Sequence, residues 1–263
     1  MNKEEFQKFF DENREKYIPG IFNYCDRWCE RCTMADKCSL YAIEKEELSE
    51  PLDEMDPDNK ELWDHLGNMM TIAMELIRDF AEEQGIDLES ISAEEEMAEW
   101  ENAKKEIDEH PLSKQSYKYV EACKAWFEEN RAAIDAIAAE LNQKAKLEIN
   151  PSQTHAQAKE INDYLEVIHW YQFQIHIKIN RALSPSLLGD DMEDPVQNDN
   201  NGSAKVALLG TNRSIAAWYG LFKYLPNFED EILNILVLLE HTKKGIAKSF
   251  PNVHKFVRPG FDE

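Results

Sequence analysis

The sequence has 263 residues, of which 29 are Lys or Arg and 52 are Asp or Glu, so its formal net charge at pH 7 is −23. This balance repels phosphate backbones and anionic lipids, so nucleic-acid binding is not expected, and a basic protein is the partner that such a surface favours. No long uninterrupted apolar run is present, so no membrane span is expected, and the predicted location is the cytoplasm, where thiols stay reduced.

Residues 1–57 are predicted to form a short helix followed by an irregular metal-binding segment. This segment contains four cysteines with the spacing C-x3-C-x2-C-x5-C, namely Cys25, Cys29, Cys32 and Cys38. Zinc takes four cysteines in a tetrahedral site, and a [4Fe–4S] cluster takes four from a compact run with short gaps. We expect one four-thiolate centre with a mainly structural role, and favour [4Fe–4S] over zinc. Thiols without a metal, reduced or joined as disulfides, are the third alternative.

Two local resemblances accompany these cysteines. The run CERCTMADKC, followed by Tyr41, resembles the iron–sulfur staple of RecB-type nucleases. The resemblance does not extend beyond this run, and no α/β nuclease core accompanies it, so nuclease activity is not expected. C-x3-C-x2-C alone is similar to the cluster motif of radical-SAM enzymes, but those enzymes are built on an α/β barrel and this chain has helical periodicity.

Residues 58–263 are expected to form one bundle of long helices, so the predicted fold class is all-α. Apolar residues recur at alternating steps of three and four in three segments, as in helices that pack at shallow angles. The three seams are Leu62, Leu66, Met69, Ala73, Leu76 and Phe80 in 58–84; Val120, Cys123, Phe127, Ile134, Ile137 and Leu141 in 113–147; and Ile161, Leu165, Ile168, Gln172, Ile175 and Ile179 in 152–183. Four tryptophans are expected to fill gaps between helices: Trp63, Trp126, Trp170 and Trp218.

The remaining segments are a polar helix over 92–109, an acidic loop over 184–202 and two helices over 203–224 and 226–249. The loop sequence, SPSLLGDDMEDPVQNDNNG, combines residues that disfavour regular structure. The residues after Pro251 cannot continue a helix and are expected to dock back as an extended tail.

A polar stripe lies beside the apolar seam of the 152–183 helix. At about 100° per residue, Glu166, His169, His176 and Asn180 fall between the solvent face and the expected core. Glu166 and His169 have the E-x-x-H spacing, which resembles half of the site in ferritin-like di-iron bundles. The resemblance implies a second metal site with additional iron, held by the Glu and His residues of the stripe and by Glu240. The alternatives are a hydrogen-bonded network that sets helix register and a metal-free pocket.

Arg213 shares its helical face with small and apolar neighbours. A buried guanidinium without a partner is costly, so an ion pair with Glu240 is expected, and an anionic ligand is the alternative. Three functions follow from these patterns: a metal-binding protein with a structural four-cysteine centre, an iron-dependent oxidoreductase with a buried Glu/His site, and an acidic protein-interaction module. No pattern names a substrate, a reaction or an oligomeric state.

Overall fold

The computed structural model describes residues 3–13, 15–47, 60–85, 87–88, 92–185 and 194–262. Every regular element in these ranges is a helix, which confirms the all-α prediction. The chain divides into two compact units, Met1–Glu101 with Val257–Glu263, and Asn102–Phe256. The predicted boundary after residue 57 lies outside the described residues. None of the helices in the described ranges is long and apolar enough to cross a bilayer.

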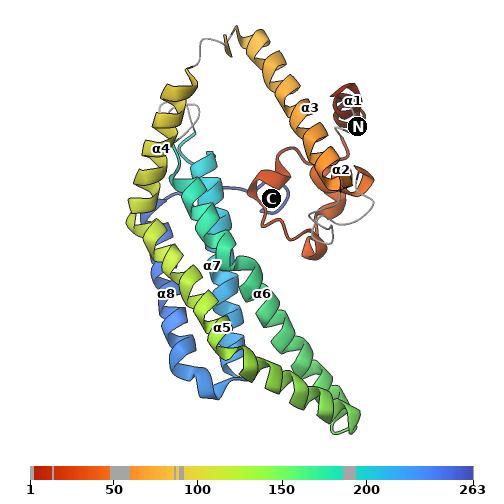
Figure 1. Ribbon diagram of the computed structural model, residues 1–263, viewed down its shortest axis with the longest axis vertical. Coiled ribbons are helices and arrows are strands. Elements are labelled where there is room, and N and C mark those ends of the chain that lie inside the picture. The colour runs from red at the N-terminus through yellow and green to blue at the C-terminus, as the bar shows by residue number, and fades with distance from the viewer. Residues whose placement is uncertain are drawn as a thin grey trace. The chain divides into compact units, whose positions relative to one another are not determined.

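The second unit is built around four long helices, which confirms that the chain contains a helical bundle, whereas the 58–84 helix, expected in that bundle, belongs to the first unit. α4 (Ala93–Glu109) leads into α5 (Pro111–Lys146), α6 (Pro151–Leu183), α7 (Asp199–Phe222) and, after the 3-10 turn η5 (Pro226–Phe228), α8 (Glu229–Ser249). Each of α5 to α8 packs against two others, in the cyclic order α5, α6, α7, α8. Successive helices of this set run in opposite directions (Figure 1).

Local sequence signals set the starts of two bundle helices. The ring of His110 caps α5 by accepting a backbone amide of the first turn at 3.1 Å, and Pro111 occupies the first helical position. Asn198 caps α7 by accepting the amide of Asn201 at 2.8 Å. The helix therefore begins inside the loop predicted over 184–202, which is shorter than expected.

The predicted seams of α5 and α6 supply much of the bundle core. Their buried members include Val120, Cys123, Ile168, Ile175 and Ile179. Trp126 and Trp218 are buried as well, and their rings meet edge to face at 4.9 Å. α6 and α7 approach closely at Gly210, where an added Cβ would lie 2.8 Å from the ring of Tyr171.

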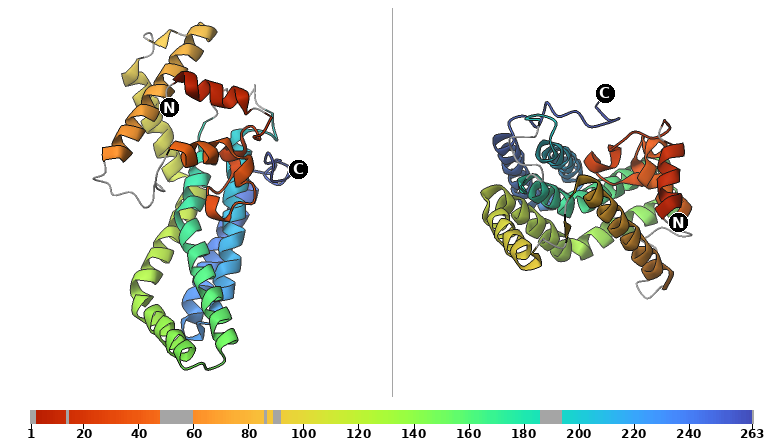
Figure 2. Two further views of the ribbon diagram at one scale, coloured as in Figure 1. Left: turned by 90° about the vertical axis from the view of Figure 1, so that its right-hand side faces the viewer. Right: turned by 90° about the horizontal axis from the view of Figure 1, so that it is seen from above.

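Besides the start of α4, the described residues of the first unit form the following α-helices and short 3-10 turns. They are α1 (Lys3–Glu12), η1 (Ile21–Tyr24), η2 (Cys29–Arg31), η3 (Ala35–Lys37), α2 (Ser39–Glu47) and α3 (Lys60–Gln84). α1 packs against α3 (Figure 2). The seam predicted for the 58–84 helix is wrong in its placement, because Leu66 and Phe80 are exposed whereas Ile72 and Ala81 are buried.

Candidate metal centre

The three 3-10 turns place the four thiols of the cysteine segment. Cys25 follows η1, Cys29 begins η2, and Cys32 and Cys38 follow η2 and η3. The backbone amides of Cys32 and Cys38 donate to the carbonyls of Cys29 and Ala35, each at 3.1 Å. The short gaps between cysteines thus become tight turns, which fold the segment back on itself.

One small pocket is lined by all four cysteines, together with neighbours that include Trp28, Met34, Tyr41 and Phe261. The sulfur of Cys32 accepts the amide of Met34 at 3.4 Å, and the thiol of Cys25 donates to the carbonyl of Phe22 at 3.5 Å. An N–H group directed at sulfur stabilises a thiolate, the form that binds metals. None of the five cysteines, all of which lie in the described ranges, forms a disulfide bond.

The charge state of Cys29 depends on its surroundings. Burial raises the pKa of the Cys29 thiol to about 11, and the Glu44 carboxylate acts in the same direction. Arg27 opposes this rise in pKa and is itself held by an ion pair to Glu44 at 3.4 Å. Arg27 also has a φ of 58°, a left-handed conformation that is uncommon outside glycine. A metal that binds Cys29 at neutral pH must therefore displace its proton, which makes binding weaken on acidification.

The thiols share the pocket without forming a ready-made metal site. Within the described residues, no three Cys, His, Asp or Glu side chains are gathered into a group that could hold a metal ion. The donor chemistry nevertheless fits zinc or a [4Fe–4S] cluster, since both take four thiolates. The four-cysteine assignment stays a prediction.

The C-terminal tail forms one wall of the thiol pocket. Phe261 lines it directly, and Gly260 lies against Ile18, Ile21 and Met34. Gly260 has a φ of 73°, and a Cβ built on it would lie 2.7 Å from Cδ1 of Ile18. Glycine is needed at this position both for the backbone conformation and for the space.

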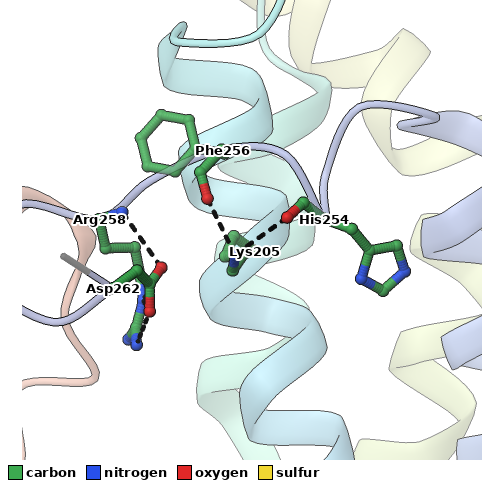
Figure 3. A network of polar contacts seen from close by, with 5 residues as sticks. All are labelled: Lys205, His254, Phe256, Arg258 and Asp262. Carbon is green, nitrogen blue, oxygen red and sulfur yellow. Dashed lines mark hydrogen bonds and ion pairs between the residues drawn. The ribbon is translucent and has the colours of Figure 1, made fainter.

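Polar contacts fix the course of this tail (Figure 3). Lys205 of α7 donates to the carbonyls of Phe256 at 2.8 Å and His254 at 3.4 Å. Beyond them, Nη2 of Arg258 lies 2.8 Å from Oδ1 of Asp262, and the Arg258 amide donates to the same carboxylate at 3.1 Å. The ion pair between Arg258 and Asp262 closes a tight turn that contains Gly260 and Phe261, the residues of the pocket wall.

The polar stripe of α6 is largely at the surface. Glu166 and His169 are exposed, whereas the helical wheel placed them between the solvent face and the core. Glu166 accepts a hydrogen bond from Asn162, and the His169 ring meets Phe127 edge-on at 6.4 Å. Glu240 of α8 is half-buried. A second metal site that includes these residues stays a prediction.

His176 of the same stripe joins a directed chain of hydrogen bonds between α5 and α6. Ser116 donates to the carbonyl of Ser113 at 2.8 Å, so it accepts the Nδ1–H of His176, also at 2.8 Å. Nε2 of His176 then accepts from Asn180 at 3.1 Å, and Asn180 accepts from the Ser113 hydroxyl at 2.8 Å. This arrangement requires a neutral imidazole, and burial lowers the pKa of His176 in agreement. A hydrogen-bonded network of the stripe was one of the expected alternatives, with Asn180 among its candidate members. The two serines were missed, although their S-x-x-S spacing places them on one face of α5.

Arg213 lies exposed on α7. It donates to the hydroxyl of Tyr171, and its guanidinium carbon lies 5.7 Å from the centroid of that ring. The ring of Tyr171 is buried, and its hydroxyl group obtains a hydrogen-bond partner in Arg213 at the surface. The predicted ion pair with Glu240 and the anionic ligand stay predictions.

Cys123 is a packing residue, as predicted. It is fully buried, and burial raises its pKa to about 12, so it is a neutral thiol at physiological pH. Beside it, Nε1 of Trp218 donates to the hydroxyl of Tyr119 at 3.3 Å.

Comparison of the chain with models of known protein families, with curated proteins and with solved structures finds no match. What the protein does must therefore be inferred from its own residues.

Proposed function

We propose that the chain is a cytoplasmic metal-binding protein in which Cys25, Cys29, Cys32 and Cys38 hold one metal centre. The observation that carries this proposal is the shared pocket, since thiols from three short turns line the same small hollow. Thiolates prefer soft and borderline metals, and four of them match zinc or a [4Fe–4S] cluster. The short gaps in the sequence favour the cluster.

The role of this centre is mainly structural. The segment that carries the cysteines is made of short turns, and few of its apolar side chains are buried, Tyr17 and Ile21 among them. Such a segment lacks the core that a larger domain provides, and a metal supplies cross-links in its place. Four protein ligands also leave no open position for a substrate.

Elemental analysis and a visible spectrum of protein purified without oxygen test the proposal. About four irons with acid-labile sulfide indicate a cluster, and about one zinc in a colourless protein indicates a zinc staple. Cys32→Ser should lose the metal, whereas Cys123→Ala, which alters a buried thiol of the bundle, should keep it. Full metal content in Cys32→Ser, or none in the wild-type protein from metal-replete cells, would overturn the proposal.

Iron beyond the amount that a cluster explains would point to a second site. Such iron should persist when Cys25 and Cys29 are both replaced by serine. If His169→Ala then removes it, the stripe with Glu166 and Glu240 is a metal site, and the oxidoreductase alternative gains direct support.

A further inference from the structure

The thiol pocket is too narrow to admit a metal centre without opening. It has a volume of about 20 Å³, room for about one water molecule, and all four of its cysteines line it. A [4Fe–4S] cluster is much larger than this space, and a zinc ion sheds its bound waters as thiolates replace them. Part of the pocket wall must therefore move when a metal enters or leaves.

The cysteine segment is closed by its own backbone. The Ile18 amide donates to the carbonyl of Lys37 at 3.0 Å, and this bond joins the ends of the stretch that contains the first three cysteines of the pocket. The turns at Cys32 and Cys38 add their own backbone bonds, each at 3.1 Å. Cys38 leads directly into α2, in which Ile43 is buried. Movement of this part of the wall would break several backbone hydrogen bonds at once, which is costly.

Another part of the wall is the tail turn, defined as residues 258–262. Phe261 lines the pocket, and Gly260 packs against two isoleucines of the cysteine segment. The ion pair of Arg258 with Asp262 joins two residues of the turn itself, as do the backbone bonds to the Arg258 carbonyl. Because these bonds are local to the turn, its release gives up the apolar contacts of Gly260 and Phe261 and leaves the backbone bonds of the cysteine segment intact.

We propose that the tail turn is a gate, which releases to let a metal reach or leave the pocket and then docks again over Cys25, Cys29, Cys32 and Cys38. This inference rests on the proposed metal site and names the step that controls exchange there. A metal with four protein ligands leaves only when incoming ligands replace its thiolates, and a docked Phe261 hinders their approach. The turn closely follows Phe256, whose carbonyl accepts from Lys205 at 2.8 Å (Figure 3), so a released turn stays tethered and docks again readily.

Alkylation of the metal-free protein tests the gate independently of any metal. Iodoacetamide is added to the full-length protein after chelation and reduction, and mass spectrometry follows each cysteine over time. Phe261→Ala removes the aromatic wall and should accelerate alkylation of the four pocket thiols by about tenfold or more. Each thiol is compared with itself between variants, because thiol reactivity differs among sites. Phe173→Ala is the matched control, since Phe173 is an exposed phenylalanine of the bundle unit, and its pocket thiols should react at the wild-type rate.

Three further observations separate opening of the gate from unfolding. Cys123 is buried in the bundle and should stay unreactive in every variant. Hydrogen exchange at the amide of Ile43 should keep its wild-type rate in Phe261→Ala, because an open gate leaves α2 folded. Asp262→Asn is the milder second variant, since it weakens the ion pair with Arg258 and keeps the aromatic wall. Its pocket thiols should react faster than those of the wild type and more slowly than those of Phe261→Ala.

The same variants then test metal exchange. Transfer of zinc or iron from the isolated protein to EDTA should be about tenfold or more faster in Phe261→Ala than in the wild type. Equal alkylation rates in the two proteins would overturn the gate, and so would exchange at Ile43 that accelerates together with alkylation. Equal rates of metal transfer would overturn its control of exchange. A wild-type protein without metal would instead contradict the proposed function, and alkylation would still decide whether the tail turn covers the thiols.

Discussion

Replacement of Gly260 by alanine should release the C-terminal tail from the cysteine segment. Gly260 has a φ of 73°, a left-handed conformation that costs an L-residue about 1–2 kcal/mol. The new Cβ would also lie 2.7 Å from Cδ1 of Ile18 and 3.1 Å from Cδ1 of Ile21. Both atoms end flexible side chains that can shift, so this crowding adds only about 1 kcal/mol. The sum of about 2–3 kcal/mol is large for a short tail, so undocking should relieve the strain.

Hydrogen exchange at two amides reports this release. The amides of Phe261 and Asp262 donate to the carbonyl of Arg258 at 3.1 and 3.2 Å, and both bonds belong to the turn that carries Gly260. Because about 1.4 kcal/mol corresponds to a factor of ten, their exchange should accelerate by about thirtyfold or more in Gly260→Ala.

Gly20→Ala is the matched control for backbone strain. Gly20 has a φ of 70°, but its Cβ would meet Asn23 only at 3.6 Å, an ordinary contact. Exchange at Phe261 should therefore stay close to the wild-type rate. Wild-type exchange in Gly260→Ala would refute the close packing of the tail, and equal acceleration in both variants would assign the effect to loss of the whole segment.

Two further predictions concern the bundle. In the folded protein, His176 should titrate below its usual pKa of 6.5, so the unfolded chain binds more protons between the two pKa values. The stability contributed by His176 is therefore full above pH 6.5 and is lost as the pH falls through the folded pKa. His176→Gln should flatten this pH dependence of stability, measured by urea titration. Gly210→Ala should be less stable in urea than Gly245→Ala by about 1–3 kcal/mol, because helix propensity cancels between them. A Cβ at Gly210 meets the buried ring of Tyr171 at 2.8 Å, whereas at Gly245 it meets the end of the flexible Leu112 side chain at 2.7 Å. Equal stability would contradict the packing argument.

The bundle helices could be predicted because their apolar faces cover one another. Ile168 and Ile175 are buried where the seam of α6 places them. The seam of α3 has the same periodicity, yet Leu66 and Phe80 are exposed and Ile72 is buried. Periodicity identifies an apolar face, but it does not say whether another part of the chain covers that face.

The candidate site was predictable only where it is local in sequence. Cys25 and Cys38 are close in the chain, so short turns bring them to one pocket whatever the rest of the fold does. Gly260 and Phe261 reach that pocket from the other end of the chain, and no sequence pattern links them to it. Likewise, the partners of His176 include Ser116 on another helix, which a reading of α6 alone does not reveal.

Because the two ends of the chain belong to one unit, the thiol pocket depends on residues that follow the whole bundle. The bundle unit spans Asn102 to Phe256, and Phe261, which lines the pocket, follows it in the sequence. When a site forms together with the fold around it, part of the binding free energy of its metal is folding free energy. A metal held by the four thiols and a docked tail should therefore stabilise each other by the same amount, as linkage requires. A metal that only cross-links the residues from Cys25 to Cys38 would leave the stability of the docked tail unchanged. Mutual stabilisation of metal and tail therefore distinguishes a metal centre that stabilises the whole unit from one that stabilises only the cysteine segment.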